Sequence, residues 1–304
     1  MTDQPFSSVH SSIAQHWNQH SKVEKKGPVS RWWKSKIIWQ HINKNYYDID
    51  SSEKFAFHNF VEARISSCEA IHALSIGCGE AHKEIRLLQK GIVSSFDLFD
   101  LSSERLSKAR QSAKDLNLSS RINFNNSDFL SQFPRKKYDL IYWHAALHHM
   151  LDVPEAVSWC KDSLREGGFF VFNEYVGPNR FQWPEDDLEI INDIRHTIPQ
   201  SIMKRAKNNG VKVKKLKRPP SLQRMIKTDP SEAADSERIL TSIQRSFASV
   251  DMLRLGGIVY MAALGDVVTY VQTPQEIAWL NACLQLDKVL ARMDRFYFAS
   301  GICK

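Results

Sequence analysis

The sequence has no hydrophobic run long enough to cross a membrane. Its longest apolar stretch, Gly256 to Val271, is interrupted by Asp266 and is shorter than the ~20 residues that a spanning helix needs. Met1 to Gln19 is polar and has no basic flank leading into an apolar core, so we expect no secretory signal. These absences predict a cytoplasmic globular protein. With 42% hydrophobic residues among 304, it can bury one large core or two small ones.

Cysteine is sparse and has no regular spacing. The five cysteines are Cys68, Cys78, Cys160, Cys283 and Cys303. Because their number is odd and no pair has a C-x-x-C spacing, the sequence predicts neither a disulfide framework nor a zinc knuckle. No metal site is expected, and a reducing compartment fits this pattern.

Acidic residues are missing from one segment, which carries all of the excess positive charge. Between Lys204 and Arg218 there are eight cations and no acid, and because the formal net charge is +7, the rest of the chain sums to −1. Such a segment can bind nucleic-acid phosphates, but a run of charge is more often a solvated surface. We interpret it as a solvated lid and expect nucleic acid to be an unlikely partner.

Two common phosphate-binding motifs are absent. The stretch "ALSIGCGEAH" carries Gly77 and Gly79 after a short apolar run, but His82 stands where a dinucleotide fingerprint needs its third glycine. The Gly-Lys-Ser/Thr ending of a P-loop is also missing. The two glycines let the backbone turn tightly and approach a ligand, while no nearby cation suits a triphosphate. The ligand of this loop is therefore expected not to be a phosphate.

Strand-like and helix-like segments alternate from Ala73 onward, as in a parallel sheet wrapped by helices. The predicted strands are "HALSIGCG", "VSSFDLFD", "INFNNSDF", "YDLIYWH", "FFVFNEYV", "FASVDMLRL" and "FYFASGICK". Predicted helices run from His82 to Gly91, from Ser103 to Leu116, from Asp152 to Gly167-Gly168, from Pro184 to Ile198, and onward from a Thr273 cap. We expect an α/β fold with a doubly wound, seven-stranded Rossmann-like sheet.

Four regions follow from this pattern. Residues 1–70 show no strand alternation and mix aromatic with basic residues, so they are expected to form an N-terminal helical cap. Residues 71–178 would bind a cofactor, and residues 179–245 would be a helical lid or substrate insertion that includes the cationic stretch as a loop. Residues 246–304 would complete the sheet.

Asp100 ends the second predicted strand, 21 residues beyond Gly79. In open α/β sheets a carboxylate at this position faces the crevice at the carboxyl ends of the strands and can accept both hydroxyls of a ribose. Asp100 could instead cap the helix that begins at Ser103. Its spacing from the glycine pair favours the ribose, so the ligand is expected to contain one.

Five motifs resemble, in order, those of the class I S-adenosylmethionine-dependent methyltransferases. They are "LSIGCGEA", "FDLFDLS", "NSDFL", "YDLIYWHAALHHM" and "LREGGFFVFNEY". The resemblance implies the methyltransferase version of the Rossmann-like sheet, S-adenosylmethionine as cofactor, and methyl transfer as the reaction. Two positions depart from the family pattern, since Ala81 replaces the third loop glycine and Ser75 replaces an acid in the first motif.

The resemblance also implies cofactor contacts at the first two motifs. Gly77, Cys78 and Gly79 would line the methionine part of the cofactor through their backbone. Asp100 would hold the ribose, and Leu101 would lie against the adenine ring.

Further cofactor contacts are implied at the next two motifs. Asp128 would accept a hydrogen bond from the adenine amino group, with Phe129 beside it. His144, just past the fourth strand, would lie beside the sulfonium.

Methyl transfer from a sulfonium is a direct displacement, which needs alignment of donor and acceptor and, for a hydroxyl acceptor, a base. His148 and His149 follow the fourth strand, and Glu174 ends the fifth. We predict His148 as the base, with Glu174 orienting it or binding a substrate hydroxyl and His149 as a second candidate. Each histidine could instead cap or pack against the next helix.

The acceptor is expected to be an oxygen or nitrogen of a small molecule or saccharide. Tyr175 ends the fifth strand, and Arg180 and Trp183 in "VGPNRFQW" would form a wall of its pocket, since this stretch resembles bacterial methyltransferases of saccharide and natural-product clusters. Two alternatives stay open: an RNA methyltransferase using residues 204–218, and a cofactor-binding protein without transfer activity. The chain could also form a homodimer.

Overall fold

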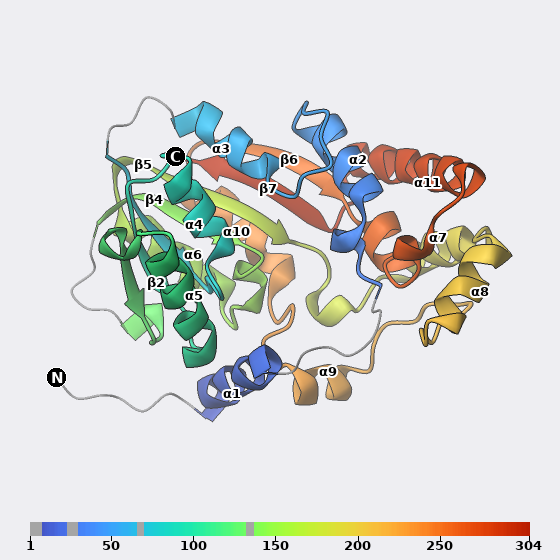
Figure 1. Cartoon of the computed structure of the whole chain (residues 1–304), viewed down its shortest axis with the longest axis horizontal. Coiled ribbons are helices and arrows are strands. Elements are labelled where there is room, and N and C mark those ends of the chain that lie inside the picture. Colours follow the sequence, from blue (N-terminus) through green and yellow to red (C-terminus); the bar gives the residue numbers. More distant parts are fainter. Residues whose placement is uncertain (1–7, 23–29, 66–69, 132–136) are drawn as a thin grey trace.

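One mixed sheet organises the molecule, shown by a computed structural model that describes residues 8–22, 30–65, 70–131 and 137–304. Its strands lie in the order β3-β2-β1-β4-β5-β7-β6 (Figure 1). Their bounds are β1 His72–Ile76, β2 Ser95–Phe99, β3 Ile122–Asn125, β4 Tyr138–His144, β5 Leu164–Tyr175, β6 Val250–Gly256 and β7 Phe298–Cys303. The first five strands pair in parallel, and β7 runs antiparallel to both β5 and β6. The predicted α/β fold with a seven-stranded Rossmann-like sheet is confirmed.

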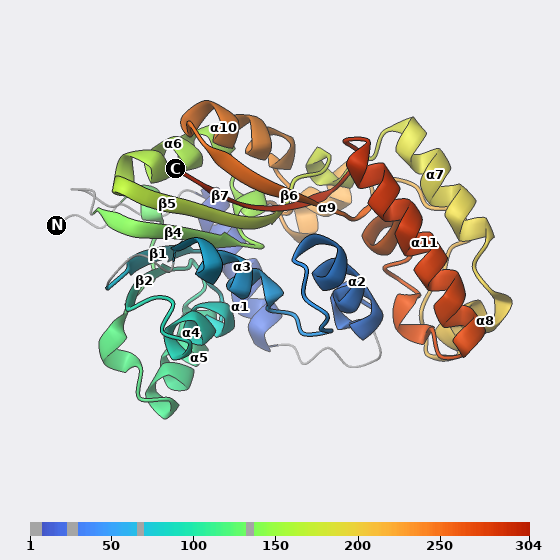
Figure 2. The same ribbon diagram turned by 90° about the horizontal axis from the view of Figure 1, so that it is seen from above.

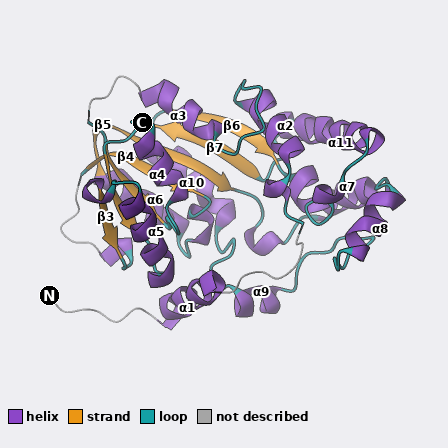
Figure 3. Ribbon diagram, in the orientation of Figure 1, coloured by secondary structure: helices purple, strands orange, loops and turns teal. Residues whose placement is uncertain are grey.

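Helices cover both faces of the sheet (Figure 3). The helices are α1 Ser8–Lys22, α2 Lys36–Tyr46, α3 Ala56–Ile65, α4 His82–Gln89, α5 Ser103–Asp115, α6 Val153–Ser163, α7 Glu185–His196, α8 Gln200–Asn208, α9 Leu222–Thr228, α10 Ile239–Ser246 and α11 Pro274–Arg292. Figure 2 shows α4 and α5 on one face and α6 and α10 on the other. No helix within the described ranges combines the length and hydrophobicity needed to cross a membrane.

Alternating side chains of the central strands build two core layers. On β4, Leu140 and Tyr142 pack into the cluster formed with α3, α4 and α5, whereas Ile141 and Trp143 pack into the cluster formed with α6 and α10. Successive side chains of a strand point to opposite faces of its sheet. The continuous apolar run of β4 is therefore what a strand buried on both faces requires.

A third hydrophobic cluster lies past one end of the strands, outside the two core layers (Figure 2). It joins Ile38 of α2, Ile191 of α7, Ile202 of α8 and Leu284 of α11 around Tyr260, and all five side chains are fully buried or nearly so. Figure 1 shows these four helices gathered at one end of the molecule. The N-terminal helices therefore pack at different places, since α3 covers the sheet while α2 belongs to this third cluster.

Local capping explains several helix starts that the sequence predicts. The Asp152 carboxylate accepts a hydrogen bond from the backbone N–H of Glu155 at the start of α6. Thr273 and Glu276 form a reciprocal capping box at the start of α11. Both satisfy backbone donors that a helix leaves without an intrahelical partner.

The predicted end of α6 at Gly167-Gly168 was wrong. The helix stops at Ser163, and β5 begins at Leu164, which pairs with Tyr138 of β4. Gly167 has a φ of +75° inside this strand, and the register shifts between Tyr138 and Leu140. The glycine pair marks an irregularity inside a strand, where glycine tolerates the left-handed backbone, and not a helix stop.

Two further boundaries differ from the sequence analysis. The cationic stretch is not entirely a loop, because Lys204 to Lys207 belong to α8, whose Ile202 and Ala206 lie one turn apart and are buried. Residues 211–220 have no regular structure. The third strand is shorter than predicted, ending at Asn125, and a short helical turn begins at Phe129.

Candidate active site

A cavity of about 350 Å³ lies where β1, β2 and β4 end. Among its lining residues are five predicted cofactor contacts, namely Gly77, Asp100, Leu101, Asp128 and Phe129. The backbone of Gly77 has a φ of +66°, and a Cβ there would lie 2.8 Å from the Cβ of Ala146. This position therefore requires glycine for two reasons, its backbone conformation and its close approach to the next loop.

Asp100 ties the first loop to the second. Its Oδ2 accepts a hydrogen bond from the N–H of Gly79 at 2.7 Å, and its Oδ1 accepts one from the N–H of Ser102 at 2.8 Å. Ser102, and not Asp100, caps α5 by accepting from the N–H of Arg105. Burial raises the pKa of Asp100. An ionised carboxylate has about four acceptor positions, so two remain for a ligand in the cavity.

Other residues of the first motif do not line the cavity. Cys78 is buried, and neither it nor Gly79 is among the described lining residues of this cavity. Ser75, which departs from the family pattern, donates a hydrogen bond to the buried carboxylate of Glu84 on α4 at 2.8 Å. The four described cysteines are free thiols, and Cys68 lies outside the described residues.

Helix α1 forms one wall of the same cavity through His10, Ile13 and Trp17. The guanidinium of Arg105 stands 4.0 Å over the ring of Trp17, and the Asn18 side chain accepts a hydrogen bond from the hydroxyl of Ser102. No sequence motif marks these residues as part of the site. Ile13 and Trp17 lie four apart on one helix face, but that spacing alone does not say what the face covers.

A second, smaller cavity of about 80 Å³ meets the first, because Ala145 lines both. Seven of its fifteen described lining residues are aromatic: Trp32, Trp39, Tyr47, Phe57, Tyr175, Tyr260 and Phe298. Polar groups are also present: Asn43, Lys54, His144, His148 and Asn173. Small-molecule sites commonly combine an apolar, aromatic lining with a few polar groups.

His144 belongs to the smaller cavity and to a buried polar chain. Its Nδ1 lies 2.7 Å from the hydroxyl of Tyr142, which lies 3.0 Å from Nε2 of His58. Burial and the charge of Lys83 hold the pKa of His144 well below its usual value. His144 is therefore a neutral group at neutral pH.

The loop between the two cavities is held by the buried carboxylate of Glu174. Its Oε1 accepts hydrogen bonds from the N–H groups of Ala146 and Leu147 at 2.8 and 3.0 Å, and its Oε2 lies 2.7 Å from Nδ1 of His148. The structure thus brings together the predicted pair His148 and Glu174. Burial disfavours the charged imidazole, but the hydrogen bond and charge of Glu174 outweigh that effect, and the pKa of His148 is raised.

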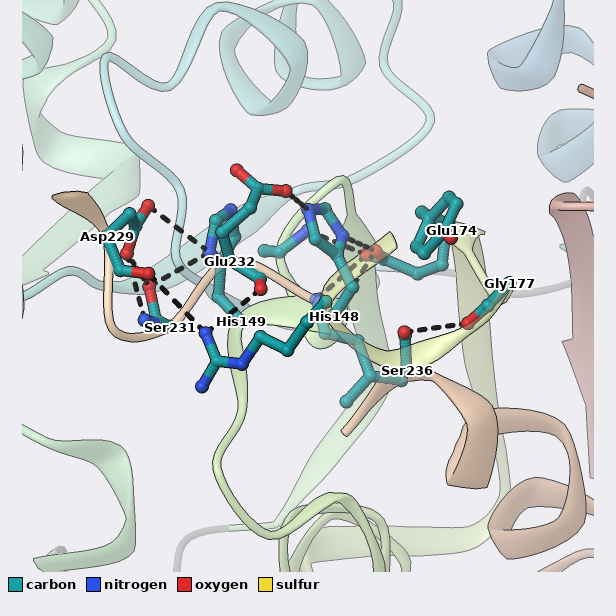
Figure 4. Close-up of polar contacts among 12 residues, drawn as sticks. His148, His149, Glu174, Gly177, Asp229, Ser231, Glu232 and Ser236 are labelled. Carbon is teal, nitrogen blue, oxygen red and sulfur yellow. Dashed lines mark hydrogen bonds and ion pairs between the residues drawn. The ribbon is translucent and has the colours of Figure 1, made fainter. Parts of the chain in front are cut away.

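His149 lines the larger cavity and lies beside His148, with 4.3 Å between the ring centroids. Its Nδ1 is 3.0 Å from the hydroxyl of Ser231, and Nε2 of His148 is 3.8 Å from a carboxylate oxygen of Glu232 (Figure 4). Burial and the neighbouring His148 hold the pKa of His149 well below its usual value. Ser231 and Glu232 are about 80 residues away in sequence, and no motif pointed to them.

Arg180 positions the loop that carries these two residues. Its guanidinium donates hydrogen bonds to the carbonyl oxygens of Pro230 and Glu232 at 2.6 and 3.1 Å. The backbone N–H of Arg180 donates a further hydrogen bond to the carbonyl oxygen of Ala233 at 2.7 Å. Trp183 lies against Phe181, with ring centroids 6.4 Å apart. In the described part of the chain, neither Arg180 nor Trp183 lines either cavity, whereas Tyr175 lines the smaller one.

A family model described as a methyltransferase domain matches residues 68–246, more than half of the chain. The chain belongs to the class I S-adenosylmethionine-dependent methyltransferases. It is a methyltransferase, and its cofactor is S-adenosylmethionine. The predicted family, enzyme class and cofactor are therefore confirmed.

One curated relative of this methyltransferase is the malonyl-[acyl-carrier protein] O-methyltransferase 2 of Ilyobacter polytropus. The two are 24% identical over 129 residues, which cover 42% of the chain and 49% of the relative. The chain thus matches about half the length of this relative.

Solved structures show the same fold over nearly the whole chain. The [4+2]-cyclase SpnF is 13% identical, with a TM-score of 0.53 over 100% of this chain and 98% of its own. The geranyl diphosphate C-methyltransferase of Streptomyces coelicolor A3(2), in complex with Mg²⁺, geranyl diphosphate and S-adenosyl-L-homocysteine, is 11% identical, with a TM-score of 0.51 over 99% and 98%. Identities this low establish the fold and leave the acceptor open.

Proposed function

We propose that this methyltransferase transfers the methyl group of S-adenosylmethionine to an oxygen or nitrogen of a small molecule or saccharide. The observation that carries this proposal is the pair of cavities that share Ala145. The larger cavity would hold the cofactor, because it contains five of the predicted cofactor residues. The smaller one would receive the reacting end of the acceptor, because its aromatic walls and few polar groups suit a small molecule.

His148 is the proposed base when the acceptor is a hydroxyl. The carboxylate of Glu174 accepts hydrogen bonds from two backbone donors and also lies at Nδ1 of His148, so it favours the tautomer that carries its proton on Nδ1. The lone pair of Nε2 is then available for the proton that leaves the acceptor. Glu174 acts as a positioning residue, and His149 is the second candidate, beside the cofactor.

The other assignments remain proposals of the same kind. Gly77, Asp100, Leu101, Asp128 and Phe129 would contact the cofactor from the larger cavity, as the family resemblance implies. Cys78 and Gly79 would contribute through the backbone of their loop. His144 and Tyr175 would face the acceptor. Arg180 would contribute indirectly, through the loop at residues 230–233, and Trp183 through Phe181, whose ring packs against Tyr175.

The RNA alternative is supported less well by the arrangement of the basic segment. Its first residues belong to α8, which packs into the third cluster, and in Figure 1 this helix lies at the far end of the molecule from α4 and α5. Its charges lie in the lining of neither cavity within the described ranges. A cytoplasmic location and a homodimer stay predictions.

A panel of small hydroxyl- and amine-bearing acceptors, including free sugars, tests the function by the release of S-adenosylhomocysteine. On the acceptor so found, His148→Ala should lower kcat by about 10²–10⁴-fold, the usual contribution of a general base, and leave the affinity for S-adenosylmethionine within a few-fold. His196→Ala is the matched control, because His196 is exposed on α7. Turnover that requires RNA, or no turnover with any small acceptor, would contradict the proposal.

A further inference from the structure

We propose that His148, His149 and Glu232 form a binding site for a divalent transition-metal ion such as Zn²⁺. One ligand atom from each of these residues lies within 4.8 Å of the others, and Nε2 of His148 is 3.8 Å from Oε1 of Glu232. Ligand bonds of ~2.0–2.1 Å in a tetrahedron place neighbouring ligand atoms about 3.3–3.5 Å apart. Small side-chain rotations would therefore bring the three groups to one ion.

The hydrogen-bond partners of both histidines prepare them as ligands. Ser231 gives its hydroxyl proton to Asp229, at 2.6 Å, so the same hydroxyl oxygen accepts from Nδ1–H of His149. Glu174 likewise accepts from Nδ1–H of His148. Each imidazole thus carries its proton on Nδ1 and presents a bare Nε2, the tautomer in which histidine binds metals.

These partners match the second shell of known metal sites. A histidine that binds a metal nearly always donates its other N–H to a carboxylate, carbonyl or water, which fixes the ring and its tautomer. Here a buried carboxylate and a carboxylate-bound hydroxyl fill that place, as Figure 4 shows for Glu174, Ser231 and Asp229. Two imidazoles and one carboxylate leave a fourth position open, as in catalytic zinc sites.

The position of the site indicates a function for the bound ion. His149 lines the cofactor cavity and His148 lines the acceptor cavity, so an ion bound to both lies at their boundary. This use rests on the proposed function. An acceptor hydroxyl at the open position would lose its proton to solvent more readily. Its oxygen lone pair would then form the new O–CH₃ bond, while the C–S bond breaks and its electrons remain on sulfur.

The ion and the base role of His148 exclude each other at one atom. When Nε2 of His148 binds the ion, it cannot accept the acceptor's proton, and the ion takes over that activation. Without an ion, His148 serves as the base. Metal binding therefore has to be measured directly and separately from turnover.

The test is a zinc titration of the full chain, stripped of metal and monitored by competition with a chromophoric chelator. We expect about one equivalent to bind, and Glu232→Gln and His149→Ala each to weaken it by at least tenfold. Glu237→Gln is the control, since Glu237 is exposed nearby and outside the cluster. An unchanged far-UV circular dichroism spectrum of each variant would show that the fold is retained.

Zinc binding by the wild type that is no tighter than by Glu232→Gln would overturn the proposal. The proposed function has a separate readout, methyl transfer by the metal-free protein. Full transfer without zinc binding would refute the metal site and leave His148 as the base. Zinc binding without transfer to any small acceptor would support the metal site and refute the proposed function.

Discussion

The two cavities of this methyltransferase are built in different ways. Apart from α1, the larger one is lined by residues that directly follow strands β1 to β4 or open the next helix. The smaller one takes its walls from α2, α3, the ends of β4, β5 and β6, the loop after β4, the turn after β6 and the start of β7. The larger cavity, the proposed cofactor site, is therefore encoded largely in short motifs, whereas the smaller cavity, the proposed acceptor site, depends more on how distant segments pack.

Contacts between distant residues hold the acceptor side together. The hydroxyl of Tyr47 donates to that of Ser300 across 253 positions of sequence, and the ring of Tyr260 stacks on Phe298 at 5.9 Å. On the cofactor side, the contact between Asp100 and Gly79 joins residues only 21 positions apart, while α1 adds contacts from farther away, such as that between Asn18 and Ser102. We therefore expect that a substitution on one side can impair that side without affecting the other.

The largest expected effect concerns Asp287, which belongs to the acceptor side only. Its buried carboxylate accepts hydrogen bonds from the N–H groups of Gly257 and Val259, before Tyr260. Burial raises its pKa from the usual 3.8 to about 6. A raised pKa in the folded state means that the protonated carboxyl favours folding at low pH. The contribution of Asp287 to the free energy of unfolding is therefore lost as the pH rises from about 4 to about 6. That range corresponds to about 3 kcal/mol of unfolding free energy.

Denaturant unfolding of the wild type and of Asp287→Asn at several pH values checks this prediction. The stability difference between the two proteins should shift by that amount between pH 4 and 6, in favour of Asp287→Asn at the higher pH. Gln285→Ala, a substitution of a group that does not titrate at an exposed position of the same helix, is the control and should follow the pH profile of the wild type. Parallel pH profiles for wild type and Asp287→Asn would mean that Asp287 stays charged when buried.

The next effect is on the cofactor side. Asp100→Ala should weaken binding of S-adenosylmethionine by about 1.5–3 kcal/mol, the value of hydrogen bonds to a charged group, or roughly 10–150-fold in Kd. Calorimetry measures it, with Asp115→Ala at the exposed end of α5 as the control. Unchanged affinity in a folded variant would mean that Asp100 only joins the loops at Gly79 and Ser102.

A smaller effect is expected from the wall that α1 provides. Trp17→Ala removes a cavity-lining ring and its contact with Arg105, an interaction usually of about 0.5–2 kcal/mol. The Kd for S-adenosylmethionine should rise by roughly 2–30-fold. Trp33→Ala is the control, because Trp33 is exposed and lines neither cavity. Equal effects of the two variants would show that α1 does not cover the bound cofactor.

The smallest effect is expected from the basic segment. Replacing Lys212, Lys214 and Lys215 by Gln should change cofactor affinity by less than twofold and remove any weak, salt-sensitive RNA binding. Lys217 is left intact because it lies 3.4 Å from Asp266 and is partly buried. Loss of activity on an RNA substrate, with none on any small molecule, would favour the RNA methyltransferase instead.

Short-range features are what the sequence determined by itself. Gly77 and Gly79, the position of Asp100 at a strand end, and the caps at Asp152 and Thr273 were all predicted from neighbouring residues. Their geometry depends on backbone conformation and on hydrogen bonds within a few residues. The alternation of strands and helices also predicted that the carboxyl ends of the parallel strands lie together, where a ligand binds.

Only the tertiary structure decided which side chains meet across long separations. It placed Trp17 in the wall of the larger cavity, His144 in that of the smaller cavity, and Ser231 and Glu232 beside the two histidines. It also ended α6 early, because pairing with β4 made a strand of the following residues. These outcomes depend on packing and pairing between segments far apart in the chain, and a single sequence carries no signal for such contacts.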